Sequence, residues 1–370
     1  MHLAFLGWGT AVPVGTLMQE EALELARSLC PRTEEQLNWL PKWYSQTGIK
    51  TRGIILGRPV LDDILQKKNE TGSPFIPNGK PDDLGPTTAQ RMEHFQTLGP
   101  PLALLASKQA LENSHISSEN FSHLITVTCT GFFSPGFDYH LIQNLSLSPS
   151  VARTQVGFMG CHGSLNGLRV AHAFVKAQPD AKVLLSSLEL CSTHFHYGWD
   201  PQKIIANALF ADGAASVVLG ASDNIAKETW KLASSGSCIL PDSANAMTWN
   251  IRDHGFEMTL AKQVPGLIKQ HLKPWLEQWL AHSGLKLEDV KSWALHPGGP
   301  RILTAIEDAL SLPANASEIS REILSKHGNM SSATLLFILK KIPYISLQMV
   351  LLDMALWMCL RLLKMKMMKL

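Results

Sequence analysis

The chain has 370 residues, of which 45% are apolar and 17% charged, and it carries a formal net charge of +2. This length and apolar content are typical of a globular enzyme with a substantial core and one or two domains. Its 33 basic and 31 acidic residues are scattered without a long run of one sign, which argues against a nucleic-acid partner.

The six cysteines lie far apart and form no CxxC pair, which argues against a zinc site or a disulfide scaffold and favours a reducing cytoplasm. Residues 1–18 are apolar but lack an early Lys or Arg and are interrupted by glycines and a proline, so they make a poor signal peptide. We expect a first core strand and its turn there, followed by a helix over Gln19–Leu29.

The middle of the chain alternates helix and strand patterns. A segment rich in Pro, Gly, Asn and Asp at 70–86 predicts a surface loop, helical spacing follows over 88–119, and HLITV at 122–127 is typical of a buried strand. The segment 151–220 predicts a glycine turn, a helix over 164–177, the strand AKVLLSS, a helix over 204–210 and the strand SVVLG. After a polar stretch at 221–227 come a helix at 264–282, the strand SWALH and helices at 301–311 and 331–340. Two similar α/β halves, 1–220 and 221–370, are the expected organisation.

Cys161 lies in GFMGCHGSLNGLRVAHAF, where a glycine turn precedes an amphipathic helix. A helix N-terminus stabilises a thiolate, and Gly160 and Gly163 leave room for a bulky acyl group to approach. A lone intracellular cysteine is also commonly a small core residue, but the flanking glycines favour a nucleophile.

His296 ends the apolar run SWAL and precedes a Pro/Gly turn, a strand-end position that favours a site residue. Asn329, in HGNMSSATLLFIL, is either an ordinary helix N-cap or a second site residue. The order Cys, His, Asn permits hydrolysis, as in papain-like proteases, or decarboxylative condensation. Hydrolysis fits poorly, because no CGSCW-like context surrounds Cys161 and about 160 residues precede it.

Four segments in the right order resemble the type III polyketide synthases, which include the chalcone and stilbene synthases, and the resemblance runs from about residue 3 to residue 340. These segments are GFMGCHGSLNGLRVA, NALFADGAASVVLG, WALHPGGPRIL and HGNMSSATLLFIL. The resemblance implies a thiolase-like, layered αβαβα fold of two similar halves. It places the nucleophile on Cys161, a gatekeeper on Phe210, and the other catalytic roles on His296 and Asn329.

The resemblance implies an acyltransferase that needs no metal or other cofactor. A Cys161 thiolate, held by a His296 imidazolium and the helix end, would take an acyl group from a coenzyme A thioester. Malonyl-CoA would then lose carbon dioxide while His296 and Asn329 stabilise the enolate, and repeated condensation would give a pyrone or resorcinol. The open alternatives are a 3-oxoacyl-ACP synthase III-like enzyme, which usually reads HQAN where this chain reads HPGG, and an inactive relative.

The positions that would set substrate choice depart from the plant pattern. Cys129 falls where plant members usually have Thr, Met258 replaces a second gatekeeper Phe, and Trp249 stands where plants have Gly. The pattern is similar to that of bacterial alkylpyrone and alkylresorcinol synthases, which accept fatty acyl starters, although Trp249 would narrow the pocket. Lys50 and Arg52 are similar in place to the family's basic cluster for the phosphates of coenzyme A. The resemblance also implies a homodimer.

The last 30 residues do not resemble the family. Family members end with a strand that carries a GFGPG-like turn, whereas residues 341–370 are rich in Met and Leu and contain no Gly. Either the reading frame shifted near residue 341 and left an unrelated tail, or the tail is a genuine amphipathic or membrane-seeking helix with Lys at its end. We expect the second half to lack a central strand, which would leave backbone groups and apolar surface uncovered and lower stability or activity.

Overall fold

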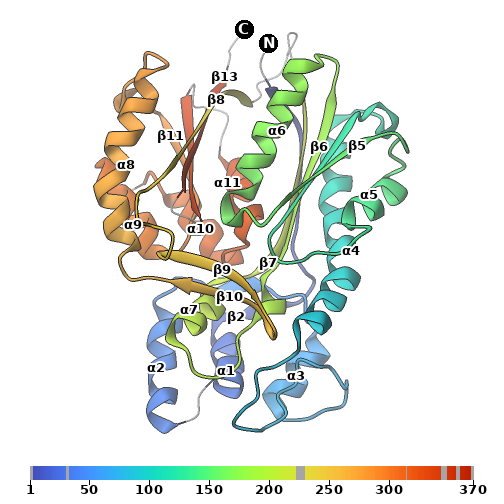
Figure 1. Cartoon of the computed structure of the whole chain (residues 1–370), viewed down its shortest axis with the longest axis vertical. Coiled ribbons are helices and arrows are strands. Elements are labelled where there is room, and N and C mark those ends of the chain that lie inside the picture. Colours follow the sequence, from blue (N-terminus) through green and yellow to red (C-terminus); the bar gives the residue numbers. More distant parts are fainter. Residues whose placement is uncertain are drawn as a thin grey trace.

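The computed structural model describes residues 3–30, 33–221, 230–313 and 315–342, and the backbone of two further strands at 348–355 and 359–367 (Figure 1). The helices are α1 (Gln19–Leu29), α2 (Glu34–Ser45), α3 (Arg58–Gln66), α4 (Thr88–Ser114), α5 (Phe137–Leu145), α6 (Gly163–Ala177), α7 (Pro201–Leu209), α8 (Val264–Ala281), α9 (Pro300–Leu310), α10 (Glu318–His327) and α11 (Thr334–Lys341). The strands are β1 (Leu3–Ala11), β2 (Thr16–Met18), β3 (Thr51–Gly53), β4 (His123–Thr128), β5 (Ala152–Gly157), β6 (Lys182–Leu190), β7 (Asp212–Ala221), β8 (Trp230–Ile239), β9 (Met247–Arg252), β10 (Gly255–Leu260), β11 (Ser292–Leu295), β12 (Gln348–Ala355) and β13 (Cys359–Met367). The predicted elements between residues 151 and 220, and the helices α8, α9 and α11, are confirmed within a few residues at each end.

The main sheet repeats one pairing pattern in two halves. Its strand order is β11-β12-β13-β8-β1-β7-β6-β4-β5. From β1 outward the ladders to β7 and then β6 are antiparallel and the next, to β4, is parallel. From β8 outward the ladders to β13 and then β12 are antiparallel and the next, to β11, is parallel. Within the described residues β1 and β8 are joined by a short antiparallel ladder, Leu3 with Leu232 and Ala4 with Lys231, which is where the two halves of the sheet meet.

Helices cover both outer faces of this sheet and fill the space between its halves. Figure 1 shows α8 and α9 on one side, α4 and α5 on the other, and α6 and α11 in the middle. Along α6 the buried residues Leu165, Leu168, Ala171 and Val175 recur every three or four positions and so form one apolar stripe. α11 is buried all round from 334 to 339, as a helix enclosed between sheets must be. Replacing Leu336 with Ala would therefore cost about 2–5 kcal/mol of stability.

The tail completes the second half of the sheet, and the expectations of a terminal helix and a missing central strand are wrong. β12 pairs in parallel with β11, from Ser292 with Met349 to Leu295 with Leu352. β13 lies between β12 and β8. The reason is that β8 and β11 would otherwise present unpaired backbone groups, and an apolar segment that fits a pleated surface satisfies them whatever its exact sequence. A shift of the reading frame stays a prediction.

Candidate active site

Cys161 lies in a strained turn at the N-terminus of α6. It belongs to a single 3-10 turn, Gly160–His162, that leads directly into the helix. Phe158 and Gly160 have φ angles of 54° and 61°, in the left-handed region, and this reverses the chain sharply after β5. A Cβ atom on Gly163 would lie 2.7 Å from Val127 Cγ1, so the glycine is what lets α6 pack against β4. The turn holds a buried thiol at a helix end that favours negative charge.

Asn329 is held by backbone hydrogen bonds that leave its side-chain amide turned into the site. Its backbone N–H donates to Leu209 O at 2.9 Å, and its carbonyl accepts from the Ala211 N–H at 2.9 Å, which fixes the residue beside the end of α7. Its side-chain Oδ1 accepts from the Ser331 N–H at 2.9 Å, so Nδ2 points away from that turn. Nδ2 is buried and has no hydrogen-bond partner within the described residues. A buried donor left open in this way is suited to an oxyanion.

His296 directly follows β11 and is buried. Burial lowers the pKa of His296 to about 3, because an imidazolium loses its solvation there. Burial therefore favours the neutral ring, and an imidazolium paired with the Cys161 thiolate stays a prediction.

A small cavity brings two of the three predicted catalytic residues together. Cys161 and Asn329 both line it, and so does Gly298, two residues after His296. The loop after β11, the turn before α6 and the turn before α11 therefore converge on one space, although they are far apart in the sequence.

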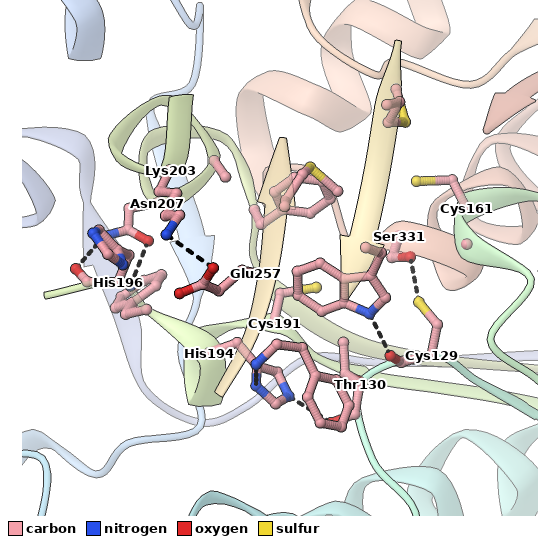
Figure 2. A pocket seen from close by; sticks show the side chains of 18 of the residues that line it. Cys129, Thr130, Cys161, Cys191, His194, His196, Lys203, Asn207, Glu257 and Ser331 are labelled. Atoms are coloured by element: carbon pink, nitrogen blue, oxygen red, sulfur yellow. Dashed lines mark hydrogen bonds and ion pairs between the residues drawn. The ribbon is translucent and has the colours of Figure 1, made fainter. Parts of the chain in front are cut away.

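This small cavity shares Cys161, Phe210 and Met258 with a larger one of about 710 Å³, a volume that includes space open to solvent. Figure 2 shows its inner end, where Cys161, Cys129 and Ser331 gather. The residues predicted to govern substrate choice also line it: Cys129, Phe210, Trp249 and Met258. They surround the predicted nucleophile, so this cavity is the candidate acyl-binding space.

The hairpin of β9 and β10 forms one wall of the larger cavity, and hydrogen bonds near Cys129 and His194 help to hold it. Trp249 Nε1–H donates to Cys129 O at 2.7 Å. The Phe256 N–H donates to His194 Nδ1 at 3.0 Å, and His194 Nε2 lies 2.7 Å from Thr130 O. Burial lowers the pKa of His194 to about 3, so the ring is neutral, accepts at Nδ1 and donates at Nε2. The sequence indicated Trp249 but not the histidine that holds its hairpin.

A buried carboxylate, Glu189, organises the inner end of the cavity. It accepts from the Cys129 N–H at 3.1 Å, from Thr130 Oγ1 at 2.7 Å and from Ser332 Oγ. Burial raises the pKa of Glu189, and it also raises the pKa of the Cys129 thiol well above its usual value, with the carboxylate adding to the effect. Cys129 is therefore a thiol that packs against the site and not a second thiolate. Glu189 was not among the predicted site residues. The signal in the sequence is a single acidic residue within the apolar strand LLSSLEL.

The structure corrects the prediction for Arg52 as a phosphate ligand. Its side chain is fully buried, and its guanidinium donates to Asn207 O at 2.6 Å, Phe210 O at 2.9 Å and Gln19 Oε1 at 2.7 Å. Arg52 thus supports the backbone behind Phe210. Lys50, two residues earlier, is exposed and stays a candidate.

A third cavity of about 830 Å³, a volume that includes space open to solvent, adjoins the small one. It shares Leu209, Leu260 and Gly298 with the small cavity. The exposed cationic residues Lys262 and Arg301 stand on its lining. The small cavity therefore shares lining residues with both of the others, and Cys161 lines two of the three.

Two family models match the chain. The N-terminal domain of chalcone and stilbene synthases matches residues 2–223, and the C-terminal domain of the same family matches residues 231–353. The chain belongs to the chalcone and stilbene synthase family. This match leaves no support for a papain-like hydrolase.

Relatives in this family come from several kinds of organism. "Alpha-pyrone synthesis polyketide synthase-like Pks18" of Mycobacterium tuberculosis is 34% identical over 257 residues, which cover 69% of this chain and 65% of Pks18. The aligned region thus spans slightly less than two thirds of that relative. "1,3,6,8-tetrahydroxynaphthalene synthase" of Streptomyces peucetius subsp. caesius is 29% identical over 335 residues, which cover 90% of this chain and 83% of that protein.

A solved structure has the same fold. PKS-I of the brown alga Ectocarpus siliculosus superposes with a TM-score of 0.89 at 26% identity, covering 99% of this chain and 98% of that one. The thiolase-like fold expected from the sequence is confirmed. No helix in the described part of the chain is long and apolar enough to cross a membrane.

Proposed function

We propose that this protein is a type III polyketide synthase that loads an acyl group from an acyl-CoA onto Cys161 and extends it with malonyl-CoA. The observation that carries the proposal is a buried thiol at a helix N-terminus that shares a cavity with the free amide donor of Asn329. Family membership supports the same chemistry.

In the loading step the sulfur of Cys161 attacks the thioester carbonyl of the starter. Neutral His296 is assigned to accept the thiol proton and to return it to the departing coenzyme A thiolate. The C–S bond to coenzyme A breaks and the C–S bond to Cys161 forms, so one hard acyl transfer becomes two easier ones. Only a neutral imidazole can accept a proton, and burial favours this neutral form of His296.

In the extension step malonyl-CoA loses carbon dioxide, and the electron pair of the broken C–C bond forms an enolate on the thioester. The Asn329 Nδ2–H donates to that oxygen, which accounts for roughly 3–4 kcal/mol of transition-state stabilisation from one donor. The enolate carbon attacks the acyl group, the thiolate of Cys161 leaves, and a ketoacyl-CoA longer by two carbons is formed. Repetition and ring closure would give a pyrone or resorcinol-type product.

Coenzyme A is proposed to lie in the third cavity, with its phosphates on exposed cations. Lys262 and Arg301 stand on the lining. Thr47 also lines it, and the neighbouring Gly48 approaches Pro300 Cγ, which brings the segment of Lys50 to the same mouth. Lys50 replaces Arg52 in this role, because pairing with phosphate requires a side chain that solvent reaches.

We propose a homodimer in the cytoplasm, with an N-terminal half at 1–220 and a C-terminal half at 221–370. The repeated ladder pattern of the sheet supports the two halves. The spacing of the six cysteines in the sequence, which is not that of a disulfide scaffold, supports a reducing compartment. Light scattering of the purified protein tests the dimer.

Incubation with labelled malonyl-CoA and a panel of acyl-CoA starters tests the function. Cys161-dependent pyrones or resorcinols support it, and the Cys161→Ala variant is the control. Condensation only when malonyl is supplied on an acyl carrier protein would favour a 3-oxoacyl-ACP synthase III-like enzyme. A folded protein that never acylates Cys161 would favour an inactive relative.

A further inference from the structure

The larger cavity ends in an ion pair that neither the sequence patterns nor the proposed chemistry uses. Figure 2 shows Lys203 and Glu257 on the side of the cavity opposite Cys161, next to His196 and Asn207. Lys203 Nζ lies 2.9 Å from Glu257 Oε2. The lysine comes from α7 and the glutamate from β10, so the pair spans the far end of the acyl-binding space.

The charges at this end balance. Lys203 Nζ also lies 3.8 Å from Asp200 Oδ2, and Arg252 Nε lies 4.0 Å from Glu257 Oε2. Burial, with Lys203 adding to it, lowers the pKa of His196 to about 4, so this ring is neutral at pH 7. Two cations and two anions therefore form this group, and its two members that line the cavity, Lys203 and Glu257, make that end polar without an excess of either sign.

The ion pair is only partly open to water, which makes its solvation sensitive to what fills the cavity. The side chains of Lys203 and Glu257 are 18% and 31% exposed. A long alkyl group would place methylenes against both charges and remove their remaining water without replacing its hydrogen bonds. An anionic end would compete with Glu257 for Lys203 and meet the repulsion of Glu257 and Asp200. Both kinds of group are disfavoured.

A neutral hydroxyl group fits this end best. An ammonium has three donors and no acceptor, and a carboxylate accepts on two oxygens. A hydroxyl can accept from Lys203 and donate to the free side of Glu257 while the ion pair stays intact. Hydrogen bonds to charged partners are the stronger kind, and a site built for them rejects an analogue that lacks the polar group.

We propose that Lys203 and Glu257 form the specificity site for the far end of the starter, and that they select acyl groups that end in a neutral hydroxyl. This inference rests on the proposed function, because it assumes that the cavity holds an acyl chain on Cys161. It replaces the expectation of a plain fatty acyl starter, and it adds two specificity residues that lie far from the catalytic turn.

The test measures binding without turnover. The Cys161→Ala variant is titrated by calorimetry with matched thioesters of four to eight carbons, each as the plain acyl, ω-hydroxyacyl and ω-carboxyacyl form of coenzyme A. At the chain length that reaches the ion pair, we expect the hydroxyacyl form to bind about tenfold more tightly than both others. Equal affinities at every length would overturn the inference, and so would tightest binding of the plain or the carboxylate series.

Two variants in the Cys161→Ala background locate the effect. Lys203→Met and Glu257→Gln should each reduce the hydroxyl preference to about twofold or less, whereas Lys80→Met, at an exposed loop lysine, should leave it unchanged. Circular dichroism checks that each variant is folded. If a variant does not fold, the comparison of the three thioester series with Cys161→Ala alone still tests the inference. A preference that survives both substitutions would overturn the inference. Turnover of short plain starters by the wild type is measured separately, so its absence would count against the proposed function alone.

Discussion

Replacing Arg52 with methionine removes a buried cation whose three donated hydrogen bonds support the wall of the site. Two of these bonds, to Asn207 O at 2.6 Å and Phe210 O at 2.9 Å, hold the end of α7 against the segment of β3. The third goes to Gln19 Oε1 at 2.7 Å. Methionine has a similar length but donates nothing, so three buried acceptors lose a charged donor.

The expected loss in unfolding free energy is about 3–5 kcal/mol, since hydrogen bonds to charged groups contribute about 1.5–3 kcal/mol each and relief of the buried charge offsets part of their sum. Guanidinium unfolding followed by circular dichroism measures it. Lys50→Met is the matched control, because Lys50 is exposed and lies only two residues away. It should keep wild-type stability and raise the KM for coenzyme A thioesters. The reasoning is refuted if Arg52→Met stays within about 1 kcal/mol of wild type and mainly weakens binding of coenzyme A.

Three other predictions concern the site itself. Asn329→Ala should lower the kcat of malonyl-CoA decarboxylation by about 10²–10³ while the cysteine is still acylated, and equal losses in both steps would argue against a role as oxyanion donor. Trp249→Phe should lower the free energy of unfolding by about 1 kcal/mol, because Cys129 O loses its hydrogen-bond donor. It should also change the products that mass spectrometry detects, and unchanged products would mean that the hairpin does not shape the cavity. The pKa values of His194 and His296, about 3 in the folded protein against 6.5 unfolded, predict that the ring signals of both stay neutral in NMR spectra down to pH 5. Between pH 3 and 6.5 the unfolded chain then binds more protons than the folded protein. The contribution of each ring to the free energy of unfolding is therefore complete above pH 6.5 and is lost as the pH falls toward 3. A ring that titrates near pH 6.5 in the folded protein would contradict this.

The sequence could predict the catalytic turns because their signals are local. Sharp turns are predicted by the glycines around Cys161 and by the Pro/Gly segment after His296. The structure has a turn at each of these two places. Such turns need particular residue types at particular positions, so a short window of sequence is enough.

Features that depend on long-range packing could not be predicted in the same way. Lys203 and Glu257 meet only because the β9–β10 hairpin lies over α7, and no short window contains both. Arg52 looked like a surface cation, since its burial follows from carbonyls that belong to distant segments. The strands of the tail could not be predicted for a related reason. Pairing with β8 and β11 determines their conformation, whereas the composition of the tail does not.

The measurement that tests the proposed function most directly is the mass of the intact protein after mixing with an acyl-CoA starter. We expect an adduct of one acyl group on the peptide that contains Cys161, absent from Cys161→Ala and discharged as a cyclised polyketide when malonyl-CoA is added. Carbon–carbon extension by Cys161→Ala at the wild-type rate, or release of the unextended acid from a Cys161 adduct in the presence of malonyl-CoA, would contradict it.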